Sequence, residues 1–240
     1  MSRSVSQPPW HLSGHEKREQ VREMFESISP TYDAMNSVMS LGLHRRWRAY
    51  AVRLLALEPG DSALDLCCGT GDFAYPLRKA VGSQGAIVGL DFSAQMLVRA
   101  KQKDAPMTPT LGDACALPFQ EERFDAITVG WGLRNVADLD ACLRECHRVL
   151  KPGGRLVSVD MAVPTNPVAR LGARVVGGWI LPTLGALVGR KEAYTYLPKS
   201  TESFDSPESL ARRMTQVGFT EPLIRRLFFG NIAVVRCVKP

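Results

Sequence analysis

The chain has 240 residues, of which 45% are hydrophobic, so it can bury one full core, and we expect a single α/β domain with additions rather than two domains. Its apolar runs are too short to span a bilayer and its first residues, MSRSVSQPPWHLSG, lack the apolar core of a signal peptide, so we expect a cytoplasmic protein. The formal net charge of +6 favours an anionic partner, and because no interleaved basic and aromatic platform is visible, a membrane surface is favoured over nucleic acid.

The first segment, over about residues 1–58, is predicted to form a helical lid. Ser13 to Glu16 has the pattern of a capping box, and apolar residues follow at helical spacing, which predicts an amphipathic helix from about Gly14 to Ser29. Beyond Pro30, which ends this helix, polar side chains stand among methionines and leucines: Tyr32, Asp33, Asn36 and His44. They are either solvated positions of a lid or a phenol, an amide and an imidazole presented to a substrate.

A short buried strand followed by a glycine turn comes next. Ala63 to Leu66 predicts the strand, and Gly69 to Gly71 predicts a tight turn into a helix that starts near Asp72. Glycine lets the backbone approach a ligand, and the following helix presents unpaired N–H groups above the strand ends. The run also fits the loose dinucleotide pattern G-x-G-x-x-G/A, so the turn alone does not identify the ligand.

Two acidic residues at strand ends discriminate between ligands. Asp65 ends the first predicted strand, where a carboxylate can meet a cationic ligand, whereas a pyrophosphate would gain nothing from an acid there. Asp91 follows the next strand, Ala86 to Leu90, where an acid accepts hydrogen bonds from ribose hydroxyls. NAD and S-adenosylmethionine both carry that ribose, but only S-adenosylmethionine carries a sulfonium and an α-amino group for Asp65. A nicotinamide-dependent oxidoreductase that uses the same turn is the alternative from another functional class.

The chain then alternates between helix and strand. Ser93 is predicted to cap a helix, Pro109 to Leu111 to form a short strand, and Phe124 to Gly130 to form the strand after it. Such alternation predicts a parallel sheet with right-handed crossovers. Asp113 comes just past a strand end and so falls on the ligand face. There it either accepts a hydrogen bond from an adenine amino group or serves as a turn residue beside Gly112.

The stretch GWGLRNV closes the fourth predicted strand, at the edge where α/β sheets carry their chemistry. Arg134 and Asn135 are therefore candidates for the reacting site; alternatively, they form an ion pair and a cap for the next helix, Asp138 to Leu150. That helix carries three conceivable metal ligands, Cys142, Cys146 and His147. They lack a fourth ligand and a Cys-x-x-Cys knuckle, so we expect buried thiols and no metal. The stretch LKPGG is predicted to stop the helix before a strand, Arg155 to Asp160.

From Ala162 to Ser203 the alternation stops. The segment is apolar and rich in glycine, and it is predicted to form a cap inserted at about residues 164–203. Arg170, Arg174 and Pro182 make it a poor spanning helix.

The alternation resumes with a predicted helix, Pro207 to Val217. Two strands follow, Leu223 to Phe229 and Ile232 to Val238, and the two-residue turn between them makes them antiparallel. The domain from about residue 59 to residue 240 is thus predicted to be α/β, with a seven-stranded, mostly parallel methyltransferase sheet whose last strand is antiparallel.

Several stretches that together cover nearly the whole chain are similar to one family: VREMFESISPTYDAMNSVMSLGLHRRWR, LDLCCGTGD, GLDFSAQML, DACALPF, FDAITVGWGLRNV, RVLKPGGRL and LPTLGALVGRKEAYTYLPKS. They resemble the ubiquinone and menaquinone biosynthesis C-methyltransferases. The N-terminal stretch, GLRNV and YTYLPKS are specific to that family, whereas the glycine turn and LKPGG belong to methyltransferases at large.

The resemblance implies a class I S-adenosylmethionine-dependent methyltransferase that methylates a ring carbon of a prenylated quinol. The family's cofactor-binding residues match Thr70, Asp91, Asp113 and Ala114. Gly130 stands where some members carry a cofactor-contacting serine. The residues that line the acceptor site match Tyr32, Arg134 and Asn135. On overall resemblance we expect demethylmenaquinol as the acceptor; the benzoquinol of ubiquinone synthesis and demethylphylloquinol are the alternatives.

Carbon methylation of a quinol requires an electron-rich ring carbon, which a neighbouring phenolate supplies in a dry site. Arginine does not readily lose a proton, so Arg134 is expected to stabilise the phenolate while Asn135 and Tyr32 orient the ring oxygen. His44 has a side chain of the right intrinsic pKa for a base, although nothing in the sequence brings it near the ring.

A long prenyl tail leaves the bilayer only at roughly 0.8 kcal/mol for each CH₂ exposed to water, so we expect the cap to face the cytoplasmic side of the membrane and admit the ring. Its apolar residues would contact lipid: Val175, Val176, Trp179, Ile180, Leu181, Leu184 and Leu187. Its basic residues outnumber its acidic ones, which suits an anionic surface. The alternatives are the interface of a homodimer and an ordinary packed insertion.

Two positions depart from the family's pattern. Cys67 replaces a glycine that methyltransferases often carry two residues after the first-strand acid, so the chain is expected to lie slightly farther from the methionine end of the cofactor. Arg190-Lys191 stands where members often carry an acidic stretch, so the surface chemistry of the cap is expected to differ. A non-catalytic RNA-binding relative is a second alternative, and only the basic charge favours it.

Overall fold

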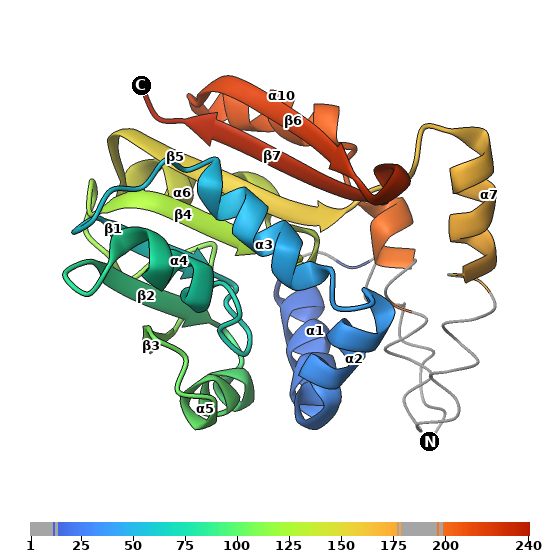
Figure 1. Cartoon of the computed structure of the whole chain (residues 1–240), viewed down its shortest axis with the longest axis horizontal. Helices are drawn as coiled ribbons and strands as arrows, with labels where there is room; N and C mark the ends of the chain where they lie inside the picture. The colour runs from blue at the N-terminus through green and yellow to red at the C-terminus, as the bar shows by residue number, and fades with distance from the viewer. Residues whose placement is uncertain (1–11, 13, 177, 179–195, 197–198) are drawn as a thin grey trace.

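A single mixed sheet forms the centre of the computed structural model, which describes residues 12, 14–176, 178, 196 and 199–240 (Figure 1). Its strands are β1 (Ser62–Leu66), β2 (Ala86–Asp91), β3 (Thr108–Leu111), β4 (Phe124–Gly130), β5 (Leu150–Met161), β6 (Thr220–Leu227) and β7 (Ile232–Val238). Their order across the sheet is β3-β2-β1-β4-β5-β7-β6. All neighbours pair in parallel except β7, which is antiparallel to both β5 and β6. The predicted seven-stranded sheet with an antiparallel last strand is therefore confirmed.

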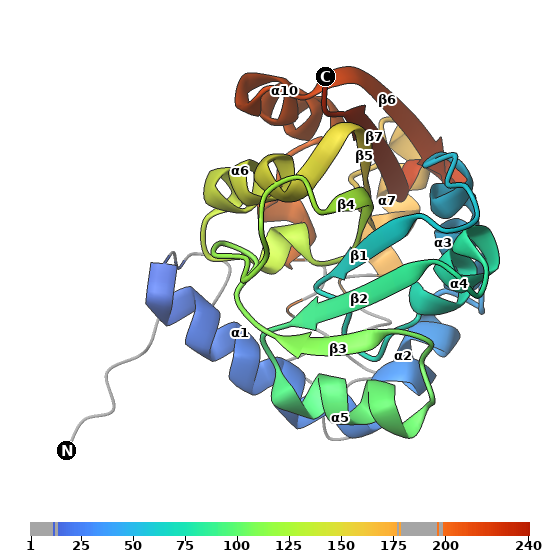
Figure 2. The ribbon, with the colours of Figure 1, turned by 90° about the vertical axis from the view of Figure 1, so that its left-hand side faces the viewer.

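Helices cover both faces of the sheet and its carboxyl edge. They are α1 (Gly14–Ile28), α2 (Tyr32–Met39), α3 (His44–Arg53), α4 (Ala74–Val81), α5 (Ala94–Gln102), α6 (Leu139–Val149), α7 (Pro167–Val175) and α10 (Pro207–Val217). Short 3₁₀ turns are η2 (Ser29–Thr31), η3 (Leu133–Asn135) and η5 (Phe228–Gly230). Figure 2 shows α6 on one face of the sheet and α3 and α4 on the other. Helix α1 crosses the carboxyl edge, where its first N–H, on Gly14, donates to the carbonyl of Ala137.

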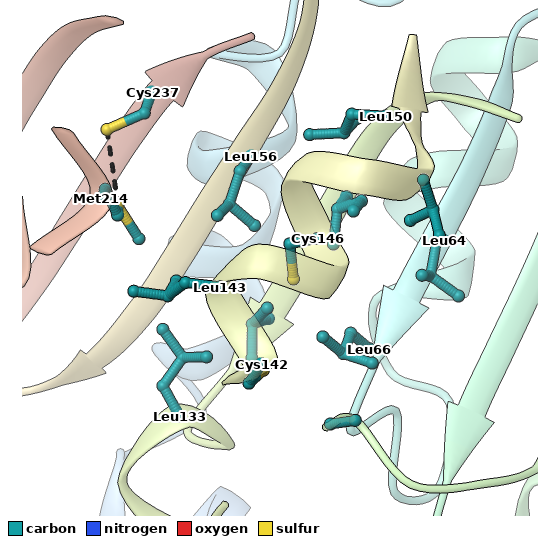
Figure 3. Close-up of a cluster of buried hydrophobic side chains, with 14 of the residues drawn as sticks. Leu64, Leu66, Leu133, Cys142, Leu143, Cys146, Leu150, Leu156, Met214 and Cys237 are labelled. Atoms are coloured by element: carbon teal, nitrogen blue, oxygen red, sulfur yellow. Dashed lines mark hydrogen bonds between the residues drawn. The ribbon is translucent and has the colours of Figure 1, made fainter. Parts of the chain in front are cut away.

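The alternation of side chains along the strands builds a core on each face. Leu64 and Leu66 of β1 pack with α6 and α10, whereas Ala63 packs with α3 and α4. Figure 3 shows Cys142 and Cys146 of α6 among leucines of the first core, so these thiols are buried as predicted. By the same alternation Asp65 lies on the face that α3 and α4 cover, a polar side chain among apolar ones.

Several predicted elements are confirmed by their capping contacts. The Ser93 side chain accepts a hydrogen bond from the N–H of Met96 at the start of α5, and the predicted helix Pro207–Val217 is observed with Ser206 as its cap. Helix α1 ends one residue before the predicted end. Ser13 of the predicted capping box lies outside the described residues.

Besides a β6 that begins at Thr220 rather than Leu223, the structure differs from the sequence-based boundaries chiefly in three places. Helix α4 begins at Ala74 rather than near Asp72, because residues 69–73 form hydrogen-bonded turns. Strand β5 begins at Leu150 rather than Arg155, because the LKPGG stretch pairs with neighbouring chain instead of only ending α6; Gly153 and Gly154, for example, exchange hydrogen bonds with Lys239. The final turn is longer than two residues, because β6 ends at Leu227 and η5 intervenes.

The predicted cap is described in part. Helix α7 begins after Asn166, whose side chain accepts hydrogen bonds from the N–H groups of Val168 and Ala169. Other residues of the predicted cap lie outside the described part of the chain: Trp179, Ile180, Leu181, Leu184, Leu187, Arg190 and Lys191. No helix among the described residues is both long and apolar enough to cross a membrane.

Candidate active site

Two neighbouring cavities lie at the carboxyl edge of the sheet. The smaller has a volume of about 60 Å³ and brings together Gly69, Asp91, Asp113, Ala114 and Gly130, all predicted to bind the cofactor. The larger has a volume of about 1070 Å³ and lies between the lid, α7 and η5. Both are lined by Phe25, Tyr32 and Trp131, so the two cavities meet at these aromatic side chains.

The remaining predicted cofactor residues lie behind the smaller cavity. Asp65, Thr70 and Gly71 are not among the described residues that line either cavity, and the side chains of the first two are almost fully buried. Gly71 has a φ of 82°, and a Cβ added there would lie 2.7 Å from the Cβ of Ala105. It is therefore needed for the close packing of the turn as well as for its conformation.

Asp91 ties the glycine turn to the start of α5. Its carboxylate accepts the N–H of Gly69 at 2.8 Å and the N–H of Ser93 at 2.9 Å. Burial raises the pKa of Asp91 to about 6, and these N–H groups oppose that rise. Each carboxylate oxygen can accept more than one hydrogen bond, so this arrangement leaves capacity for a ribose hydroxyl.

Asp65 is a buried acid with an unused oxygen. Its Oδ1 accepts the hydroxyl of Thr128 on the neighbouring strand at 3.0 Å, and its Oδ2 has no hydrogen-bond partner among the described residues. Burial raises the pKa of Asp65 to about 8. A buried carboxyl group in this state favours a cationic ligand that would restore its charge, which fits the amino group and the sulfonium of S-adenosylmethionine.

Thr70 joins the glycine turn to the lid. Its hydroxyl donates to Oδ1 of Asp33 on α2 at 2.5 Å. The ammonium group of Lys103 lies 2.8 Å from the other oxygen of Asp33 and 2.7 Å from Asp72. Asp33 is thus held by the turn and by the end of α5, a link between distant segments that the sequence did not predict.

Asp113 is also engaged by the lid. Its carboxylate pairs with the guanidinium of Arg18 on α1 at 2.8 Å and accepts the N–H of Cys115 at 2.9 Å. Space for roughly one water molecule requires about 10–15 Å³, so the smaller cavity holds only a few waters beneath α1. Entry of a ligand of adenosine size therefore requires α1 to move.

Two side chains of α3, His44 and Arg48, line the larger cavity. The buried guanidinium of Arg48 lies 4.6 Å from the ring centre of Trp131, contacts His44, and lies 3.4 Å from a carboxylate oxygen of Asp72. Burial and the charge of Arg48 lower the pKa of His44 to about 4, so its imidazole is neutral at pH 7. The sequence did not bring His44 near the acceptor, but the structure puts it on the wall of this cavity.

Arg134 lines the larger cavity, and its charge is already partnered. Its guanidinium forms a buried ion pair with Asp160 at the end of β5. Burial raises the pKa of Asp160 against the opposing charge of Arg134. The sequence indicates an ion pair only as the alternative for Arg134 and does not identify Asp160 as the partner, although the position of Asp160 at the end of the strand next to β4 is a signal for it.

Asn135 lines the smaller cavity rather than the larger one. Its Nδ2 donates to the carbonyl of Trp131 at 2.9 Å, and its Oδ1 accepts the hydroxyl of Tyr196 at 2.7 Å. Tyr196 belongs to the YTYLPKS stretch and lines the larger cavity. Its bond to Asn135 therefore connects the predicted cap to the residues around Trp131, which form the wall between the cavities. This bond was not predicted, since 61 residues separate its partners.

The wall between the cavities is tightly packed. A Cβ at Gly130 would lie 2.7 Å from Cε2 of Phe73, so a serine there would require that ring to move. Trp131 and Cys67 both adopt left-handed backbone conformations, with φ of 55° for each. Cys67 lines the smaller cavity, and a Cβ added at Gly132 would lie 2.5 Å from the Cβ of Cys67.

The cysteines of α6 lie away from both cavities. The ring of His147 packs edge-on against Phe219, 5.1 Å between ring centres. Within the described ranges of the chain, no group of three His, Cys, Asp or Glu side chains is arranged to hold a metal ion.

Comparison with known proteins identifies the relatives of this arrangement. A model of the ubiE/COQ5 methyltransferase family matches residues 13–239. The demethylmenaquinone methyltransferase of Desulfitobacterium hafniense is 41% identical over 236 residues, covering 95% of this chain and 93% of that protein. That of Staphylococcus aureus is 40% identical over 222 residues, covering 91% and 92%. A SAM-dependent methyltransferase from Aquifex aeolicus superposes with a TM-score of 0.60 at 16% identity, covering 80% of this chain and 89% of that one, a likeness of fold.

Proposed function

The chain belongs to the ubiE/COQ5 methyltransferase family, and from that premise we propose that it transfers a methyl group from S-adenosylmethionine to a ring carbon of demethylmenaquinol. The observation that carries the proposal is the junction of the two cavities at Tyr32 and Trp131. A cofactor in the smaller cavity and a quinol ring in the larger one would face each other there. The larger cavity has the volume and the apolar lining that a ring with an attached prenyl chain requires.

On the side of the methyl donor, each carboxyl group would bind a different part of the cofactor. Asp91 would hold the ribose, Asp113 with Ala114 would hold the adenine once Arg18 has moved away, and Asp65 would balance the positive charge of the cofactor. Gly69 would lie beside the ligand, Thr70 and Gly71 would support the turn from behind, and the missing side chain of Gly130 leaves room for the ring of Phe73. The bound cofactor supplies an electrophilic methyl group.

On the acceptor side, we assign Arg134 and Tyr32 to the ring oxygen. Burial raises the pKa of Tyr32, so the phenol stays protonated and can donate a hydrogen bond. The Nε of Arg134 has no hydrogen-bond partner among the described residues, so Arg134 retains a donor after pairing with Asp160, and the paired carboxylate fixes its orientation. Arg134 therefore acts as a rigid donor more than as an unpaired cation. Asn135 would act through Tyr196 and the wall between the cavities.

His44 is a poor general base, since a pKa of about 4 gives its imidazole little affinity for a proton at neutral pH. The guanidinium groups of Arg48 and Arg134 on the cavity wall would instead favour loss of the quinol proton to solvent water, because hydrogen bonds from them would stabilise the phenolate that results.

The names of the relatives favour the naphthoquinol over the other acceptors. The benzoquinol of ubiquinone synthesis is the second candidate, because the family model covers that branch as well. The nicotinamide-dependent oxidoreductase is set aside by membership of a methyltransferase family.

For the organisation of the chain we propose a lid over residues 1–58 on a methyltransferase domain over residues 59–240, with the cap at about residues 164–203 facing the cytoplasmic side of the membrane. The lid's contacts to Asp113, Thr70 and the carbonyl of Arg134 support its role as a separate closing element. A homodimer interface is the competing assignment for the cap.

The experiment compares purified protein with reduced demethylnaphthoquinol and with 2-polyprenyl-6-methoxy-benzoquinol, each with methyl-labelled S-adenosylmethionine. We expect label on the ring carbon of the naphthoquinol first. Faster labelling of the benzoquinol would reassign the acceptor, and tight NADH binding without S-adenosylhomocysteine binding would overturn the methyltransferase assignment.

A further inference from the structure

Large apolar side chains are exposed at one end of the molecule, around the larger cavity. Leu41 and Val168 are each 80% exposed, and Phe229 is 81% exposed. They lie on three segments: residues 38–46 between α2 and α3, residues 163–176 including α7, and residues 225–231 at the β6–β7 turn. Because all three segments contribute residues to the lining of this cavity, they surround one opening. We call these three segments the rim.

Three of the exposed apolar residues of the rim have a strained backbone. Leu41, Phe228 and Phe229 have φ angles of 51°, 46° and 55°, in the left-handed region that favours glycine. A glycine at these positions would relieve the strain and remove an exposed apolar side chain at once. Phe228 also packs on Trp47, with 5.7 Å between the ring centres, which fixes the turn that presents Phe229. Strained positions that display apolar side chains to water indicate a contact outside the chain.

Helix α7 presents a second apolar surface. It has no buried residue, and Val168, Leu171 and Val175 recur at the spacing that puts them on one side of the helix. Val168 also lines the larger cavity, whereas Leu171 and Val175 are exposed and are not among its described lining residues, so this apolar side of α7 extends from the cavity onto the outer surface of the helix. Figure 1 shows α7 at the edge of the molecule, on the same side as the turn between β6 and β7.

The charge of the rim has one sign. The sequences of its three segments contain no aspartate or glutamate. Their arginines are Arg45, Arg46, Arg170, Arg174, Arg225 and Arg226, of which Arg226 is paired with Glu208 on α10. Exposed apolar side chains surrounded by basic side chains complement an anionic phospholipid bilayer, which has negatively charged headgroups above an apolar core.

We propose that the rim docks onto an anionic bilayer, with Leu41, Phe229 and α7 entering the headgroup region so that the larger cavity opens at the lipid surface. The biological purpose of this surface, access to an acceptor whose tail stays in lipid, rests on the proposed function. The surface itself stands on the exposure, strain and charge of the rim. It extends the docking surface beyond the cap, to the lid and to the β6–β7 turn.

The test measures co-sedimentation of the full chain with vesicles of phosphatidylcholine that contain about one third phosphatidylglycerol, and with phosphatidylcholine alone. Two variants remove rim side chains that do not line the cavity: Leu41→Gly, and Leu171→Ser combined with Val175→Ser. Val98→Ser is the matched control, because Val98 is exposed on α5, which is not part of the rim. Each rim variant should bind anionic vesicles at least about tenfold more weakly than the unmodified chain, and the loss should grow with the apolar area removed. The control should bind like the unmodified chain.

Leu41→Gly has a further readout, because glycine accepts the observed φ. It should lose vesicle binding without any loss of thermal stability, which a merely structural residue would not do. Both rim variants should methylate a tail-less quinol at the unmodified rate and a long-tailed quinol in vesicles more slowly.

Vesicle binding unchanged in both rim variants would overturn the proposal. So would conversion of a dimer to monomers with vesicle binding retained, since the rim would then be a subunit interface. Equal binding to both kinds of vesicle would refute the role given to the arginines. If the unmodified chain binds vesicles but methylates no quinol, the proposed function fails while the docking surface stands.

Discussion

The replacement of Asp65 by asparagine tests whether this buried acid is kept for the cofactor. Burial raises its pKa from an ordinary 3.8 to about 8, and its Oδ2 lacks a partner within the described residues. At pH 7 the folded protein must therefore hold a proton that the unfolded chain has released. At about 1.4 kcal/mol for each pH unit above 3.8, that costs about 4 kcal/mol of unfolding free energy.

The sign follows from the raised folded pKa. The stability of the unmodified protein is fully present below about pH 3.8 and falls as the pH rises towards 8. Asparagine does not titrate, so this loss is absent from the variant. Its new amide nitrogen replaces an unpartnered oxygen and costs about 1–3 kcal/mol, so we expect a net gain of about 1–3 kcal/mol at pH 7.

Urea unfolding from pH 5 to pH 8 measures that gain in stability, and calorimetry measures the affinity of the variant for S-adenosylmethionine. The variant should gain stability relative to the unmodified protein as the pH rises, and should bind the cofactor about tenfold to a hundredfold more weakly, because a charged hydrogen bond is lost. A stability difference that does not change with pH, or unchanged affinity, would refute the reasoning about Asp65.

Three further substitutions test the lid, the wall and the acceptor site. Arg18→Ala removes a half-exposed ion pair worth about 0–1 kcal/mol, so thermal stability should hardly change, while stopped-flow association of S-adenosylmethionine should be faster because Asp113 is released; slower association would contradict the lid assignment. Gly130→Ser puts a Cβ 2.7 Å from Phe73 and should lower the unfolding free energy by about 1–3 kcal/mol in urea, whereas unchanged stability would mean that the ring moves freely. Arg134→Gln leaves Asp160 buried without its partner and should cost about 3–5 kcal/mol of stability; adding Asp160→Asn should restore most of that stability but not turnover, and recovered turnover would exclude Arg134 from the mechanism.

The sheet could be predicted because its strands are short apolar runs that end in turns or polar residues. The run before Gly69, for example, has one polar residue, Asp65, and the strand after it ends at Asp91, so strand positions and ligand-facing acids came from the same pattern. The start of β5 was missed because LKPGG carries the signals of a helix stop, while its pairing depends on Lys239, far away in the chain.

The contacts that complete the site could not be predicted from local pattern. Arg48 and Trp131 are in contact because α3 packs on the sheet beside the end of β4, and no residue spacing in the sequence predicts that contact. The same holds for Tyr196 and Asn135. Thr70 and Gly71 lie behind the cavity because the turn is packed against α2 and the end of α5, and Asp65 lies behind it because its strand points it to the face that α3 and α4 cover.

The central claim is that a methyl group passes from a cofactor in the smaller cavity to a ring carbon in the larger one. The most direct measurement is a single-turnover reaction of the purified chain with methyl-labelled S-adenosylmethionine and reduced demethylnaphthoquinol, followed by mass spectrometry that locates the label. The account predicts label on the ring carbon, with little transfer when Arg134 is glutamine and Asp160 is asparagine. Label on a ring oxygen, or equal transfer by that variant, would contradict it.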